Sequence, residues 1–262
     1  MERQFLRLER FIGRENIELL KKKRVALVGL GAVGGYALEA LARSAIGSFT
    51  LVDFDIISET NINRQILALH STIGKKKTEI AEHRVLDINP EAEVKVMNIF
   101  AEEGRYEEIF RGADIVLDAI DSLGPKVGLL ESAYKSDVRI ISSMGAALRR
   151  DPTLIRTCDL FDTWGCPLAR EVRSHLRRRG VSRGIDVVFS PEKVNFKYIP
   201  PEEDDEIEFD DKILNRGRKR VMLGSLPTVT AIFGEMLAHL ALKKLLPEGT
   251  LEGEAEWRPE SR

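Results

Sequence analysis

The chemistry of this chain begins at a glycine-rich turn that follows an apolar stretch. Residues 24–34 read Arg-Val-Ala-Leu-Val-Gly-Leu-Gly-Ala-Val-Gly, and Asp53 comes 19 residues after the last glycine. In this GxGxxG spacing, Gly29 allows a tight turn, Gly31 lets a phosphate approach the backbone, and Gly34 lets the next helix pack close to the sheet. The helix start favours an anion, and a carboxylate at Asp53 can accept a ribose hydroxyl. The pattern predicts a nucleotide-binding unit; the alternative is a glycine turn without a ligand.

A second group of polar residues follows in the loop 57–65 and in the lysine run after Gly74. Arg64 keeps its charge, and its guanidinium can fork onto phosphate oxygens. Three lysines, residues 75–77, are expected in the first turn of a helix, where the helix dipole disfavours cations. Such lysines are useful beside a polyphosphate; the alternative is a solvated basic turn.

Two carboxylates, Asp118 and Asp121, bracket the end of an apolar run over 113–120. An acid at this position is a natural partner for Mg²⁺ on a nucleotide phosphate. For Asp118, an N-cap or a strand-end hydrogen bond is an equally good interpretation. The cations and a metal-binding acid favour ATP over a nicotinamide dinucleotide. None of the four histidines sits at an obvious strand end, where a dehydrogenase would need a proton-transfer group.

The elements that must position these residues alternate along the chain. We expect strands at 24–29, 49–54, 94–97, 113–120 and 138–142, and helices at 1–20, 32–44, 75–88, 124–135 and 223–246. The first helix is amphipathic, with Phe5, Leu8, Phe11 and Ile12 at helical spacing. Alternating strands and helices predict an α/β fold, a Rossmann-like doubly wound, mostly parallel sheet with flanking helices. In such a sheet the ligand binds beyond the carboxyl ends of the strands.

The composition is that of an ordinary globular chain. Its 262 residues are 43% hydrophobic and 31% charged. The net charge of −2 means that the protein has no overall positive charge of the kind that favours nucleic-acid binding. The two cysteines, Cys158 and Cys166, form no CxxC pair, which argues against a zinc ribbon and a disulfide scaffold. With no apolar signal core at the N-terminus and no uninterrupted membrane span, we expect a cytoplasmic protein.

We expect one domain over 1–262, with a nucleotide-binding core at about 22–160. A variable, substrate-side and C-terminal helical part would cover about 161–247, and a flexible tail 248–262. Arginines crowd residues 170–183, whereas 202–211 is almost entirely acidic. Like-charge runs of this kind are usually solvated.

Several ordered motifs resemble the ThiF/MoeB superfamily, the bacterial relatives of ubiquitin-activating enzymes. They are Gly-Leu-Gly-Ala-Val-Gly at 29–34, Leu-Val-Asp-Phe-Asp at 51–55, Thr-Asn-Ile-Asn-Arg-Gln at 60–65, Gly-Lys-Lys-Lys at 74–77 and Asp-Ala-Ile-Asp-Ser at 118–122. Residues 61–69, 87–90, 142–146 and 151–153 further resemble the tRNA threonylcarbamoyladenosine dehydratase branch. Residues 145–148 and 224–227 depart from the pattern of that branch.

The resemblance implies ATP and Mg²⁺ as cofactors and activation of a carboxylate as its acyl-adenylate. Carried over by motif, Asp53 would bind the ribose, Asn61 and Arg64 the phosphates, Lys77 would neutralise them, and Asp121 would hold the metal. Arg7 matches an arginine that the superfamily lends across a homodimer. The implied catalytic residues are Arg7, Arg64, Lys77 and Asp121. The implied nucleotide-binding residues are Gly29, Gly31, Ala32, Gly34, Asp53, Asp55, Asn61, Asn63, Arg64, Lys77, Asp121 and Ser122.

Within that branch, the implied function is ATP-dependent dehydration of threonylcarbamoyladenosine in tRNA. The arginines of 170–183 would then contact tRNA phosphates; the alternative is an exposed helix balanced by the acidic run 202–211.

Three other functions stay open. The first is activation of a ubiquitin-like sulfur carrier, the MoeB or ThiF role, which would add a sulfur-transfer partner protein. Such enzymes typically carry two CxxC pairs, which this chain lacks, and Cys166 would be its transfer thiol, although a structural role suits that cysteine better. The second is a nucleotide-sensing or tRNA-binding protein without activity. A nicotinamide dehydrogenase is a distant third.

Overall fold

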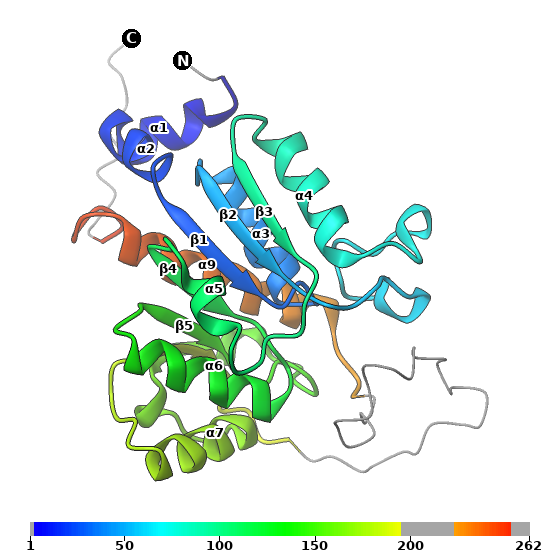
Figure 1. Cartoon of the computed structure of the whole chain (residues 1–262), viewed down its shortest axis with the longest axis vertical. Coiled ribbons are helices and arrows are strands. Elements are labelled where there is room, and N and C mark those ends of the chain that lie inside the picture. The colour runs from blue at the N-terminus through cyan, green and yellow to red at the C-terminus, as the bar shows by residue number, and fades with distance from the viewer. Residues whose placement is uncertain (1–2, 195–222, 253–262) are drawn as a thin grey trace.

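A sheet runs through the described part of the protein, with helices on both of its faces (Figure 1). The computed structural model describes residues 3–194 and 223–252. The acidic run 202–211 and residues 253–262 of the expected tail lie outside the described residues.

The sheet has seven strands in the order β3-β2-β1-β4-β5-β7-β6. Their bounds are Arg24–Val28 (β1), Ser48–Val52 (β2), Glu93–Met97 (β3), Ile115–Asp118 (β4), Ile140–Ser143 (β5), Arg156–Asp159 (β6) and Asp186–Phe189 (β7). Every neighbouring pair is parallel except β6 and β7, which run antiparallel. The predicted doubly wound, mostly parallel sheet is therefore confirmed, and β6 and β7 are strands that the sequence analysis missed.

The helices are α1 (Leu6–Ile12), α2 (Arg14–Leu20), α3 (Gly34–Arg43), α4 (Lys77–Ile88), α5 (Tyr106–Phe110), α6 (Leu123–Lys135), α7 (Pro167–Arg178) and α9 (Pro227–Leu245). Short 3₁₀ turns lie at Arg3–Phe5, Glu59–Asn61, His70–Thr72, Pro152–Leu154 and Leu160–Asp162. None of the helices among these residues has the length and apolar character of a membrane span.

The single helix expected over 1–20 is wrong. The chain breaks between α1 and α2 at Gly13, which adopts φ 86°, a backbone conformation that glycine tolerates and other residues avoid. Phe11, expected on the buried face, has 71% of its surface exposed, whereas Phe5 and Ile12 are buried. Phe11 precedes the break and lies in α1, so the helical spacing correctly placed Phe5 and Ile12 on the buried face but wrongly added Phe11 to it.

Residues of each central strand alternate between two apolar layers, as side chains of a strand must. In β1, Val25 and Leu27 join the layer formed with α3, α4 and α9, and Ala26 and Val28 join the layer formed with α5, α6 and α7. Figure 1 shows α3 and α9 behind the sheet and α5 and α6 in front of it. The helix expected at 223–246 is confirmed as α9, whose buried residues pack in the first of these layers.

Helices α3 and α4 are tied together by a buried carboxylate. Glu39 accepts hydrogen bonds from Arg84 Nε at 2.7 Å and from Arg43 Nε at 2.8 Å. Burial of Glu39 opposes its ionisation, but these two arginines outweigh that effect and lower the pKa of its carboxyl below the ordinary value. The ionised form therefore stabilises the fold.

Glu39→Gln should lower the free energy of unfolding by about 1–2 kcal/mol near pH 7. A lowered carboxyl pKa contributes stability above the unfolded-state value of about 4.3 and loses it as the pH falls through the folded-state value. Urea unfolding of variant and wild type should therefore differ at neutral pH and converge near pH 3. An equal difference at both pH values would contradict the role of the ionised carboxylate.

Candidate nucleotide site

The glycine turn lies directly beyond the carboxyl end of β1. The strand order of the sheet reverses here, because β1 pairs with β2 on one side and with β4 on the other. Gly29 has φ 93°, and a Cβ there would lie 2.8 Å from the Ala119 carbonyl oxygen. A Cβ on Gly34 would lie 1.8 Å from the Gly29 oxygen. At Gly31 the nearest atom would be Gln65 Nε2, at 4.0 Å, so its backbone is open to a ligand. The turn and the close helix packing are as expected, and the loop of 29–34, which includes Ala32, offers bare backbone to a phosphate.

Asp53 follows β2 and is turned toward this loop. Its Oδ2 accepts the Leu30 N–H at 2.7 Å, and its Oδ1 accepts the Asp55 N–H at 2.8 Å. Burial, with 8% of the residue exposed, raises the pKa of the Asp53 carboxyl, and the Lys77 ammonium counteracts this. Both oxygens are held by backbone donors, and each keeps a further lone pair for a hydroxyl group.

Arg64 and Asp121 lie in the loops after β2 and β4 and interact electrostatically. Arg64 Nη1 donates to the Thr60 carbonyl at 2.9 Å and to Asn63 Oδ1 at 3.0 Å. Burial lowers the pKa of the Arg64 guanidinium, and the nearby Asp121 carboxylate opposes that shift. Asn61 lies in the same loop, where its Oδ1 accepts the Ser58 N–H at 3.3 Å. The loop therefore presents its cation beside the acid of the neighbouring loop.

Of the three lysines after Gly74, only Lys77 is buried, and its side chain contacts Asp55. Its Nζ lies 2.9 Å from Asp55 Oδ2, and 5% of the residue is exposed. Helix α4 begins at Lys77, so Lys75 and Lys76 precede it, which corrects the expectation of three lysines in its first turn. Both of these residues are exposed, and Lys76 pairs with Glu79 at 3.1 Å.

The two acids after β4 have different surroundings. Asp118 is fully buried: its Oδ2 accepts from Lys126 Nζ and from Ser142 Oγ, each at 2.6 Å, and its Oδ1 accepts the Ile120 N–H. This is the strand-end hydrogen bonding held open for Asp118, which leaves its carboxylate engaged by the protein. Asp121 is exposed and accepts a hydrogen bond from Ser122 Oγ at 3.2 Å.

The described residues hold no cluster of three or more His, Cys, Asp or Glu that could enclose a metal ion. Mg²⁺ rarely needs one, since it is usually bound by one or two carboxylates together with substrate phosphates and water. Asp121, exposed at the nucleotide edge, fits that kind of site.

Sequence reasoning missed Gln65 and Lys126. Gln65 is 7% exposed beside Gly31, and its Oε1 has no hydrogen-bond partner, which is unusual for a buried amide. Its place in the motif 60–65 was the available signal. Lys126 was hidden in an ordinary amphipathic helix, although a lysine between apolar residues was a weak signal for a buried partner.

Arg7 lies far from these residues within one chain. It is exposed on α1, and α1 and α2 sit beside the amino end of β1, at the opposite edge of the sheet from the glycine turn (Figure 1). A backbone hydrogen bond agrees with this position of α2. The N–H of Ser48, at the start of β2, donates to the carbonyl of Lys23, which lies between α2 and β1. A single copy therefore does not bring Arg7 to the other predicted residues.

The arginines of α7 and of the segment after it are tied to their own chain. All six contact other groups: Arg170, Arg173, Arg177 and Arg178 in the helix, and Arg179 and Arg183 after it. Arg183 pairs with Asp162, and Arg177 lies 5.4 Å from the centre of the Phe161 ring. Contact with tRNA stays a prediction. Cys166, at the start of α7, is 3% exposed, in keeping with a structural role.

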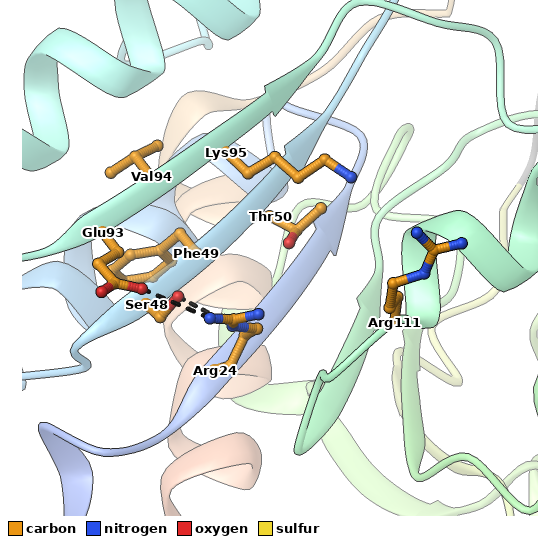
Figure 2. A pocket seen from close by; sticks show the side chains of 8 residues that line it. All are labelled: Arg24, Ser48, Phe49, Thr50, Glu93, Val94, Lys95 and Arg111. Carbon is orange, nitrogen blue, oxygen red and sulfur yellow. Dashed lines mark hydrogen bonds and ion pairs between the residues drawn. The ribbon is translucent and has the colours of Figure 1, made fainter.

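A polar cavity of about 360 Å³ lies at β1–β3, away from the carboxyl edge (Figure 2). Arg24 Nε donates to Ser48 Oγ at 3.0 Å, and its Nη2 lies 3.4 Å from Glu93 Oε2. Arg111 lines the same cavity and is drawn apart from Arg24, Ser48 and Glu93 in Figure 2. None of the predicted site residues lines it.

The same fold occurs in known proteins. The profile described as ThiF family matches residues 1–257. The chain belongs to the ThiF family. Among curated members it is 45% identical to the tRNA threonylcarbamoyladenosine dehydratase of Bacillus subtilis over 193 residues, which cover 73% of this chain and 76% of that one.

A solved structure of the E. coli tRNA N6-threonylcarbamoyladenosine dehydratase in complex with ATP superimposes with a TM-score of 0.81. The two are 33% identical, and the match covers 92% of this chain and 93% of the other. The molybdopterin-synthase adenylyltransferase of Salmonella typhimurium is 35% identical over a shorter match, 52% of this chain and 54% of that one. Within the ThiF family, the dehydratase likeness thus spans more of the chain than the carrier-activator likeness.

Proposed function

We propose that this protein is an ATP-dependent tRNA threonylcarbamoyladenosine dehydratase. The observation that carries the proposal is the meeting of the glycine turn, Asp53, Arg64 and Asp121 at one edge of the sheet, in a fold that matches the E. coli dehydratase along nearly its whole length.

The chemistry replaces a poor leaving group. A free carboxylate is a weak electrophile, so its oxygen first attacks the α-phosphorus of ATP and pyrophosphate leaves. A nitrogen of the neighbouring ureido group then attacks the acyl carbon and gives up its proton, and AMP leaves with the former carboxylate oxygen. The substrate loses one water overall. The protein must mainly position the reactants and stabilise charge on phosphorus, so no protein nucleophile is required.

The residues divide this task by position. The backbone at Gly31 and Ala32 would receive phosphate, and Asp53 the ribose. Asn61, Asn63 and Arg64 would hold the phosphates, and Lys77, kept in place by Asp55, would neutralise them. Asp121, with Ser122 beside it, would hold Mg²⁺, which when bound screens the charge of the phosphates.

We place Arg7 of a second copy at each site. The support is its exposure on α1 and the distance of α1 from the glycine turn of its own chain. A homodimer would then be the active form, and the exposed basic surface of α7 would be available to tRNA phosphates.

The test is a reaction of the purified protein with ATP, Mg²⁺ and tRNA from a strain that lacks this gene. Mass spectrometry of the nucleosides should show the threonylcarbamoyladenosine losing the mass of one water, with pyrophosphate released only when the modified tRNA is present. Adenylation of a sulfur-carrier protein without any change in the tRNA would favour the carrier-activator alternative.

Lys77→Gln should raise the KM for ATP about tenfold or more, because it removes a charge-assisted contact to phosphate. Steady-state pyrophosphate release measures the effect. Lys75→Gln is the matched control, since Lys75 carries the same charge two residues away on an exposed position. Equal effects of the two substitutions would mean that only the general positive field matters.

A further inference from the structure

A second cavity, of about 450 Å³, adjoins the candidate nucleotide site and is lined by residues 148–150, 192–193 and 224–226. Asn63 Nδ2 of the nucleotide loop lies 3.5 Å from the Ser225 carbonyl oxygen on its wall. The Leu148 N–H donates to the Gly224 carbonyl at 2.9 Å and joins two of the cavity's sides. Leu148 adopts φ 63°, which is strained for a leucine and is the kind of backbone that functional sites retain.

Arg149 is the unusual residue of this cavity. It is 3% exposed, its Nη1 donates to the Glu192 carbonyl oxygen, and its Nε is a buried donor without a hydrogen-bond partner. The Glu192 carboxylate accepts the N–H groups of Arg150 at 3.0 Å and Asp151 at 3.1 Å and forms no ion pair with Arg149. Among the described residues no carboxylate forms an ion pair with Arg149.

A buried guanidinium with an open donor and no counter-ion is costly to the fold, since a buried charge is normally paired. Its planar donors match the paired oxygens of a carboxylate or a phosphate. An oxyanion in the cavity would therefore supply the counter-charge that Arg149 lacks.

We propose that this cavity is an oxyanion-binding subsite for the tRNA substrate, with Arg149 as its anchor. The proposal rests on the function proposed above and adds the place where the substrate is held. The oxyanion is either the threonyl carboxylate or a backbone phosphate of the modified nucleotide. The carboxylate would be held beside the nucleotide loop before its activation.

Two probes separate these sources in binding titrations with the full chain. The free nucleoside N6-threonylcarbamoyladenosine carries the carboxylate and no phosphate, and an unmodified tRNA transcript carries phosphates and no such carboxylate. Arg149→Gln should weaken one of the two by about tenfold or more while leaving the affinity for ATP unchanged. Loss confined to the nucleoside assigns the carboxylate, and loss confined to the transcript assigns the phosphate.

Arg149→Lys, which keeps the charge, should restore part of the lost affinity and guards against misfolding of the glutamine variant. Arg111→Gln is the matched control, because Arg111 lines the cavity of Figure 2 instead. The subsite is wrong if the wild type dehydrates tRNA and Arg149→Gln, folded by its thermal unfolding midpoint, binds both probes like the wild type. If the wild type itself causes no dehydration and binds neither probe, the proposed function fails together with the subsite.

Discussion

Asp121→Asn should reduce ATP-dependent turnover by about 10²–10³-fold while leaving the protein folded. The carboxylate is exposed at the nucleotide edge, interacts electrostatically with Arg64 and accepts a hydrogen bond from Ser122 Oγ. An amide of the same shape keeps that contact but lacks the charge that Mg²⁺ requires. Pyrophosphate release at saturating ATP and modified tRNA measures the loss.

The matched control is Glu91→Gln, which removes the same charge from an exposed position before β3, at the other edge of the sheet. Both variants should unfold within about 1 kcal/mol of the wild type, as surface substitutions usually do. Turnover that survives in Asp121→Asn at near the wild-type rate would mean that another group holds the metal.

Lys126→Met should lower the free energy of unfolding by about 3–5 kcal/mol, because it leaves a buried carboxylate without its counter-ion. Lys126 and Asp118 are both 0% exposed and lie 2.6 Å apart, and the ammonium also donates to the Ser143 carbonyl at 2.8 Å. Removing the ammonium leaves Asp118 charged in an apolar interior, which is worse than removing both charges.

Urea unfolding of the double variant Asp118→Asn, Lys126→Met should therefore recover most of the loss. Lys95→Met provides the comparison at an exposed pair, because Lys95 and Glu108 lie 3.4 Å apart with about half of each side chain in solvent. That substitution should change the free energy of unfolding by less than about 1 kcal/mol. A double variant as unstable as Lys126→Met would show that the lysine acts through packing.

The nucleotide half of the fold was readable because its signals are local. A glycine turn, its strand and an acid at the end of the next strand lie within residues 24–53, and the structure shows a steric reason for Gly29 and for Gly34. The outer strands β6 and β7 gave no such signal. They are four residues each, and their pairing is decided by contacts between residues about 30 positions apart.

Long-range partners also explain what stayed open at the site. Asp118 could be read as a metal ligand or as a hydrogen-bonded strand end, and only the approach of Lys126 and Ser142 decides between them. The arginines that follow α7 looked free in sequence, yet Arg179 pairs with Glu131 and Arg183 with Asp162, both on other segments. The roles assigned to Arg7, Lys77 and Asp121 toward a ligand stay predictions for the experiments above.

The antiparallel edge of the sheet has a consequence for how the chain is made. Within the described sheet β6 pairs only with β7, although β6 is translated first. During translation, residues 156–159 therefore cannot pair until residue 189 has left the ribosome. Until then, the hydrogen-bonding edge of β5 that later pairs with β7 has no partner strand. A nascent or prematurely ended chain of that length would already contain every nucleotide-contacting residue proposed above, yet it would present an open strand border on which other chains can aggregate.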